Sequence, residues 1–353
     1  MANPTEKLKA IEAAAAKRPP RKAADPTPEP VPGPPKRLRR TGKPSNKILA
    51  DAQNELERFV RSHGIEQFDL FPGGEYPTPL TRLPLFPPTQ RRTAQQLIAN
   101  SVLDGKDWIP LESRWDGGGV YKSPNTLTVY DEDTLIGIMR LRTLGLSGVG
   151  TKMPAPAHVP PNVDGSVRVH SLCLLVSQLE TVIKGYEPKR GWGGKAISER
   201  RQSIERLAAT KLKFEKVKND ARYSGTVIDL INVTWIGDRS DACYYAQFHP
   251  VVSSWLESYR TFLDIDVRRQ LSPTGKALYR FLASQRSNAA YSQRLDIIQQ
   301  AIGSEEELPE FKRKAREQLN KMINLEFLES GDISGTGRKT PYKLSVVFKR
   351  REL

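Results

Sequence analysis

A segment near the C-terminus combines side chains that can recognise the edges of DNA bases. Apolar residues with helical spacing predict a helix over 309–324, and Lys312, Arg313, Arg316 and Asn320 lie off its apolar stripe. Arginine can bridge guanine and asparagine can bridge adenine, whereas lysine more often contacts phosphate. The pattern therefore indicates a helix that inserts into the major groove of DNA, although a solvated amphipathic helix has the same spacing.

The elements around this helix favour the DNA-binding interpretation. Ser272 is placed to cap a helix that has Pro273 at its first position. The other predicted elements of 250–353 are helices at 291–302 and 309–324 and strands at 325–328 and 342–348. This order is that of a winged helix, with Arg338 and Lys339 in a basic wing between the strands.

The preceding region, 95–249, is predicted to repeat this order. Its expected elements are strand-like pieces at 108–115 and 126–130, helices at 131–144, 168–184 and 195–210, and β-rich runs at 225–235 and 243–248. The DNA-contact candidates of its last helix are Lys195, Arg200, Arg201 and Arg206. This basic stripe is less regular, because Arg201 falls near the apolar face of the helix.

Charge and composition agree with an anionic partner. The chain has 353 residues and a formal net charge of +15, from 55 Lys and Arg against 40 Asp and Glu. Nucleic acid is the commonest partner of such a chain, and an acidic membrane surface is the alternative. The sequence shows neither a signal peptide nor an apolar run of the roughly 18 residues that a spanning helix needs, which predicts a cytoplasmic protein.

The N-terminal part differs in composition from the rest. Residues 1–47 are rich in proline, lysine and arginine, which predicts a disordered basic arm. Such an arm serves either as a solvated linker or as a non-specific phosphate contact. Residues 48–94 are predicted to be a linker that begins with a short amphipathic helix over 48–63.

No pattern in the sequence predicts catalysis, a metal site or a cofactor. The four histidines do not cluster at ligand spacing, and none has the second histidine that a DNA-nicking enzyme uses beside a tyrosine nucleophile. Gly194-Lys195 lacks the remainder of a phosphate-binding loop. Cys173 and Cys243 lie in apolar contexts and are predicted to be reduced core residues.

A peptide-docking motif lies within the linker. Gln67-Phe68-Asp69-Leu70-Phe71 can place Leu70 and Phe71 in a partner's pocket while the Gln67 amide binds the rim. The string resembles the sliding-clamp-binding motif of bacterial replication proteins, although it also fits a loop packed on its own domain. Leu83-Pro84-Leu85-Phe86 lacks the glutamine and is predicted to anchor the linker to the first domain.

Three stretches of the chain resemble the TrfA-type plasmid replication initiators, within the winged-helix Rep group. They are Gln67–Phe71, Lys195–Phe214 and the Leu271–Ser284 segment that begins Leu-Ser-Pro-Thr. The second is similar to the family's first recognition helix, and the third to the helix that opens its second winged helix. The resemblance covers roughly 60–350 and implies an α+β fold with two tandem winged-helix domains after the disordered arm.

The resemblance also implies a non-enzymatic function in a bacterial cytoplasm. Such a protein binds double-stranded iteron repeats at a plasmid origin and helps to melt the adjacent DNA, where single-stranded DNA is a further partner. It recruits the host initiator, the helicase and the polymerase III sliding clamp, and it exchanges between monomer and homodimer. A winged-helix transcriptional regulator or a plasmid partition protein would fit the same two domains and is the alternative.

Overall fold

The computed structural model describes residues 73–89, 108–115, 118–142, 151–154, 165–218, 221–236, 242–337 and 340–349. The arm over 1–47, the helix over 48–63, the Gln67–Phe71 motif and the Arg338-Lys339 pair lie outside these ranges. The described residues form a mixed α+β fold that belongs to one compact unit, Leu56–Leu353.

The strands of the described residues form five small sheets. In spatial order they are β1-β11, β6-β10-β9, β12-β14-β13, β2-β3-β7-β8 and β4-β5, and neighbouring strands in each sheet are antiparallel. The strands of the first half are β1 (Gly73–Pro77), β2 (Ile109–Trp115), β3 (Gly118–Lys122), β4 (Thr151–Pro154), β5 (Ser166–Val169), β6 (Ser171–Leu175), β7 (Lys211–Lys218), β8 (Ala221–Asp229), β9 (Ile231–Ile236) and β10 (Cys243–Phe248). Those of the second half are β11 (Arg260–Asp264), β12 (Ala290–Arg294), β13 (Leu328–Ser334) and β14 (Lys343–Phe348).

Three helices form the centre of the first half: α5 (Val129–Leu141), α6 (Val176–Lys184) and α7 (Gly194–Ala209). Thr128 begins α5 with a capping box, in which its hydroxyl accepts from the Tyr130 N–H and its own N–H donates to Asp131 at 2.9 Å. Gly137 lets α5 approach α6 closely, since a Cβ at that position would lie 2.6 Å from Leu179. The helix predicted over 195–210 is confirmed as α7.

The predicted helix over 168–184 is wrong in its first half, which forms β5 and β6. Leu172 and Leu174 are buried while Cys173 between them is exposed, so the apolar period there is two rather than 3.6. The strand predicted at 126–130 is also wrong, because 126–128 are irregular and α5 begins at Val129.

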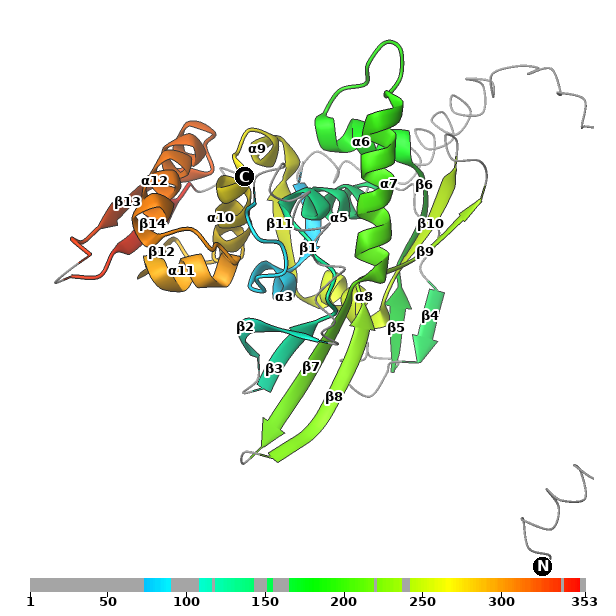
Figure 1. Ribbon diagram of the computed structural model, residues 1–353, viewed down its shortest axis with the longest axis horizontal. Coiled ribbons are helices and arrows are strands. Elements are labelled where there is room, and N and C mark those ends of the chain that lie inside the picture. The colour runs from blue at the N-terminus through cyan, green and yellow to red at the C-terminus, as the bar shows by residue number, and fades with distance from the viewer. Residues whose placement is uncertain are drawn as a thin grey trace, which may run out of the picture. The chain divides into compact units, whose positions relative to one another are not determined.

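The segment that follows α7 is a strand that the sequence analysis did not identify. Helix α7 ends at Ala209, and β7 pairs with β8 in a long hairpin that Figure 1 shows extending from the lower end of α7. The predicted run over 225–235 is divided at Leu230 between β8 and β9. The Lys195–Phe214 stretch is therefore a helix followed by the start of a strand.

The prediction of two reduced core cysteines is wrong. Cys173 lies on the exposed face of β6 and is joined to Cys243 by a disulfide. In the antiparallel register Cys173 lies opposite Tyr245 and Cys243 lies opposite Leu175, so the two cysteines are diagonal neighbours on one face of the sheet. The disulfide closes a sequence separation of 70 residues that includes α6, α7 and the β7–β8 hairpin.

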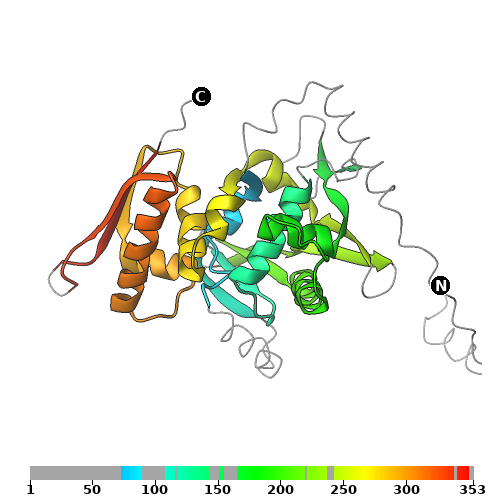
Figure 2. The same ribbon diagram turned by 90° about the horizontal axis from the view of Figure 1, so that it is seen from above.

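The second half packs three helices on a small sheet: α10 (Pro273–Ala283), α11 (Leu295–Ile302) and α12 (Leu308–Asn324) against β12-β14-β13. Ser272 caps α10 as predicted, accepting from the Gly275 N–H at 3.2 Å. Gly275 also permits a close approach to α12, because a Cβ there would lie 2.2 Å from the side-chain amide oxygen (Oε1) of Gln318. Figure 2 shows α12, in orange, beside the strands of this sheet.

Short elements connect the two halves. Strand β1 pairs with β11, and the short helices that contact this pair are α3 (Thr78–Thr81), α8 (Pro250–Ser258) and α9 (Ile265–Arg269). The Leu83–Phe86 segment is buried as an anchor, and it contacts both halves. Pro87 accepts from the Val129 N–H of α5, while the Phe86 ring lies 5.9 Å from the Arg280 guanidinium of α10. The predicted division into domains at 249 and 250 stays a prediction.

Candidate nucleic-acid interface

Helix α12 buries one face and presents a polar face to solvent. Phe311, Ala315 and Leu319 are buried, as their spacing predicts. On the other face Arg313 and Arg316 have side chains 63% and 50% exposed, and Asn320 is exposed. The structure therefore brings together, on one solvent-facing surface, the three residues of α12 that can read bases.

Intramolecular contacts orient several of these side chains. Arg313 donates to both carboxylate oxygens of Glu310, at 2.9 and 2.7 Å. The hydrogen bonds from Arg313 lower the pKa of Glu310 to about 2. Lys312 is half-buried, and its ammonium lies 3.8 Å from the centroid of the Tyr342 ring.

The β13–β14 hairpin lies beside α12 as a wing would. Arg316 donates to the Ile333 carbonyl oxygen at 2.8 Å, and its guanidinium is 3.8 Å from the Asp332 carboxylate. The contacts of Lys312 with Tyr342 and of Arg316 with β13 hold the helix and the hairpin in a fixed relation (Figure 1). Arg338 and Lys339, which come between β13 and β14 in the sequence, lie outside the described residues.

The arginines predicted as DNA contacts on α7 point into the protein. Arg200 donates to Glu180 at 2.7 Å and to the Thr134 hydroxyl at 2.6 Å. Arg206 donates to Asp131 at 2.6 and 3.1 Å. Arg201 donates to the Tyr244 hydroxyl at 2.8 Å.

The outer face of α7 is polar rather than strongly basic. Its exposed positions follow a helical stripe, which is Lys195, Ser198, Gln202 and Glu205. Lys211, at the start of β7, is 57% exposed and lies 3.9 Å from Asp229 of β8. Of the four predicted α7 contacts, Lys195 alone lies on this exposed stripe.

The N-terminus of α5 forms an acidic cluster that the sequence analysis missed. The consecutive carboxylates Asp131, Glu132 and Asp133 receive cations from several helices: Arg206 from α7, Arg268 from α9, and Lys276 and Arg280 from α10. Because α5 belongs to the first half and α9 and α10 to the second, these ion pairs connect the two halves.

Glu132 is the most buried member of this cluster. Its side chain is fully buried and accepts from Arg280 at 2.8 Å, from Arg268 at 2.7 Å and from the Tyr76 hydroxyl at 3.1 Å. Two arginines thus share one carboxylate without access to water, so removing that carboxylate would leave buried charge uncompensated. One signal was visible in the sequence, since Arg280 falls on the otherwise apolar face of its helix.

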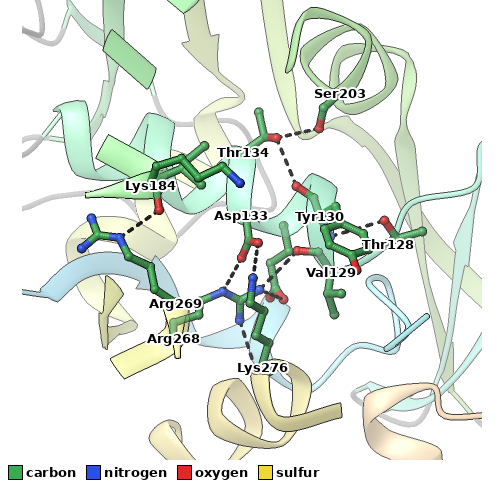
Figure 3. A network of polar contacts seen from close by, with 12 residues as sticks. Thr128, Val129, Tyr130, Asp133, Thr134, Lys184, Ser203, Arg268, Arg269 and Lys276 are labelled. Carbon is green, nitrogen blue, oxygen red and sulfur yellow. Dashed lines mark hydrogen bonds and ion pairs between the residues drawn. The ribbon is translucent and has the colours of Figure 1, made fainter. Parts of the chain in front are cut away.

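Asp133 links α9 and α10 at the edge of the cluster. It accepts from Arg268 at 2.7 Å and from Lys276 at 2.5 Å, as Figure 3 shows. Burial would raise the pKa of Asp133, but the charges of Arg268 and Lys276 outweigh burial and hold it below its usual value. Burial lowers the pKa of Lys276, an effect that Asp133 offsets only in part.

Within the described ranges we find no group of three or more His, Cys, Asp or Glu side chains that could hold a metal ion. Among the helices of that same part of the chain, none is long and apolar enough to cross a membrane.

Comparison with known proteins finds similar solved structures but no matching family. No family model and no curated protein matches the chain. Two crystal structures of domains 2 and 3 of RctB are similar to it. The first, of the selenomethionine derivatives, has a TM-score of 0.47 and 13% identity, and covers 70% of this chain and 92% of that chain. The second has a TM-score of 0.46 and 14% identity, and covers 77% of this chain and 96% of that chain.

Proposed function

We propose that this protein binds double-stranded DNA with α12 in the major groove and the β13–β14 hairpin beside it, as a winged helix. The observation that supports this most directly is the exposed row of Arg313, Arg316 and Asn320 on a helix whose opposite face is buried. Such a row can contact successive base edges, while the wing contacts the backbone. The net charge of +15 supplies the attraction to phosphate.

The α7 region is proposed to be a second winged helix, which contacts mainly the phosphate backbone of the DNA. Its exposed Lys195 and Gln202, with Lys211 on the adjoining β7–β8 hairpin, suit contacts to phosphate and to a few base edges. Arg200 and Arg206 are proposed to position α7 through Glu180 and Asp131 rather than to touch DNA.

The biological role that we propose is initiation of plasmid replication, without enzymatic activity, in a bacterial cytoplasm. It is supported by the resemblance of three stretches to TrfA-type initiators and by the second helical unit opened by Ser272-Pro273. In this role the two units bind iterons, Gln67, Leu70 and Phe71 bind the sliding clamp, and other surfaces engage the host initiator and helicase. A transcriptional regulator or a partition protein is the alternative.

Footprinting of the purified protein on the DNA flanking its own gene tests this proposal. An initiator should protect several direct repeats spaced by about two helical turns. A single palindromic footprint over a promoter would indicate a regulator instead. Absence of any footprint at low salt would contradict DNA recognition altogether, because phosphate contacts are strongest there.

A further inference from the structure

A cavity of about 520 Å³ lies between α5, α6, α7, α9 and α10. Its walls come from both halves of the described unit, because α5 to α7 belong to the first half and α9 and α10 to the second. This volume lies within the range of roughly 300–1,000 Å³ that small-molecule sites occupy. A DNA duplex is far too wide to enter it, so any ligand must be a small molecule.

The charges that line the cavity are unbalanced toward the positive. Three carboxylates line it, Asp133, Glu180 and Glu199, against six cations, which are Lys184, Arg200, Arg206, Arg268, Arg269 and Lys276. Glu180 binds Arg200 at 2.7 Å, and the Lys184 ammonium lies 4.0 Å from the other Glu180 oxygen. Asp133 is shared by Arg268 and Lys276. Arg206, Arg268 and Arg269 also bind Asp131, Glu132 and Asp266, which lie outside the lining. The excess of positive charge therefore lies mainly at Lys184 and Lys276, because each lysine shares one carboxylate with an arginine, and it favours an anion between them.

Two lysines are placed to meet such an anion. Lys184 ends α6 with a side chain 45% exposed, while Lys276 lies in the first turns of α10 and is 15% exposed. Figure 3 shows both side chains around the space beside Asp133. Burial lowers the pKa of Lys276 beyond what Asp133 restores, so a second anion nearby would stabilise its charged form.

The remaining walls suit a planar, less polar group. Ile136, Ile183 and Ile265 line the cavity together with Tyr130. The Lys276 ammonium lies over the Tyr130 ring, 6.0 Å from its centroid. A base packed against the isoleucines and the edge of this ring would therefore place its phosphates near a lysine.

We propose that this cavity binds a nucleoside phosphate, with the phosphates held by Lys184 and Lys276 and the base against Tyr130 and the isoleucines. Because the walls come from both halves, the bound ligand would hold α7 and α10 together. The proposal is independent of DNA binding.

Isothermal titration calorimetry of the full chain with ADP tests the proposal, with adenosine and inorganic pyrophosphate as partial ligands. We expect one saturable site for ADP, weaker binding of pyrophosphate and much weaker binding of adenosine. Lys184→Ala should weaken ADP binding about tenfold or more, because it removes a charge-assisted contact from an exposed residue that the fold does not need. Lys189→Ala is the matched control, since Lys189 is exposed on the turn after α6 and outside the cavity.

The outcomes distinguish specific binding of ADP in the cavity from non-specific attraction of ADP to a positively charged protein. Lack of saturable ADP binding at millimolar concentration would overturn the proposal. Equal weakening by Lys184→Ala and Lys189→Ala would do the same, as would loss of ADP binding when the protein is saturated with duplex DNA. Retained ADP binding in the presence of DNA, with a selective loss in Lys184→Ala, would support it.

Discussion

Arginines serve opposite purposes at the N-terminus of α5 and on the outer face of α12. Around α5, Arg206, Arg268 and Arg280 turn inward and meet buried carboxylates. On α12, Arg313 and Arg316 remain at least half exposed. The helices that carry these two sets of arginines all contain basic residues in the sequence. The first set uses its charge to hold the protein together, and the second keeps its charge available to a partner. A count of cations on a helix therefore does not measure its capacity to bind DNA.

The largest test of this difference is Glu132→Gln. The change leaves Arg280 buried without a counter-charge and Arg268 with Asp133 alone, and breaking a buried pair of this kind costs about 3–5 kcal/mol of unfolding free energy. Urea denaturation measures the loss. Glu310→Gln on α12 is the control and should leave the urea midpoint unchanged, because its pair with Arg313 is exposed. Similar midpoints for both variants would contradict the contrast.

Arg206→Ala and Lys195→Ala test the difference between an inward-facing and an exposed cation on the same helix, α7. Asp131 is fully buried and would lose its guanidinium partner, so we expect about 2–3 kcal/mol lower stability. Below the melting temperature, the affinity of the folded variant for DNA should change little. Lys195→Ala should behave in the opposite way, with unchanged thermal melting and weaker DNA binding. A drop in DNA affinity for Arg206→Ala without a loss of stability would indicate that Arg206 contacts DNA and does not mainly stabilise the fold.

Arg316→Ala tests the outward-facing region. If Arg316 reads a base, binding to the target should weaken by about 1–3 kcal/mol, with relaxed preference at one base pair. Competition binding with a target and its single-base variants measures both quantities. Arg316→Lys is a useful companion, because it retains the charge but loses the bidentate geometry. Equal affinities for all three proteins would assign Arg316 to a purely structural contact with β13.

The smallest expected effect is the pH dependence of the first half. Burial, together with Arg142 and Arg168, lowers the pKa of His170 to about 4, and these effects outweigh Glu257, 3.6 Å away. The neutral form is therefore favoured in the folded state. Its contribution is fully present above the unfolded pKa of about 6.5 and is lost as the pH falls toward 4.

Between pH 7 and 5 we expect a loss of about 1–2 kcal/mol from His170, measured by urea denaturation at each pH. His170→Gln should flatten part of this dependence. All four histidines precede residue 250, so no histidine of the α12 region contributes. A wild-type stability that is constant over this pH range would contradict the interpretation.

Local patterns in the sequence were sufficient to find the apolar stripes of the helices in both candidate units, but not all of their bounds. The helix predicted over 291–302 begins at Leu295, because 290–294 form β12, and the strand predicted over 325–328 begins at Leu328. The Ser272 cap, the α11 apolar positions and the α12 stripe depend on neighbours three or four residues apart, and these predictions are confirmed. The helix predicted over 195–210 is confirmed as well, although α7 ends at Ala209 and a strand follows it. Periodicity is a local property, so a single sequence is enough to reveal it.

Features that depend on distant partners could not be predicted in this way. Strands β6 and β7 were missed or assigned to helix, and each is specified by pairing with a strand elsewhere in the chain. The Cys173–Cys243 disulfide and the partners of Glu132 depend on which elements lie side by side. The direction of Arg200 and Arg206 likewise follows from carboxylates on α5 and α6, which helical spacing within α7 does not reveal.

The pairing of β1 with β11 sets the earliest point of synthesis at which the β1-β11 sheet can form. Glu75 of β1 contacts Arg260 of β11 across 185 positions of sequence. At about 5–20 residues per second, synthesis keeps β1 waiting for its partner for about ten seconds or more. During this interval the edge of β1 has no strand to pair with, although Tyr76 can already contact Glu132 of α5, and this open edge is a natural binding site for a chaperone. A nascent chain that stalled before β11 would present this surface for much longer.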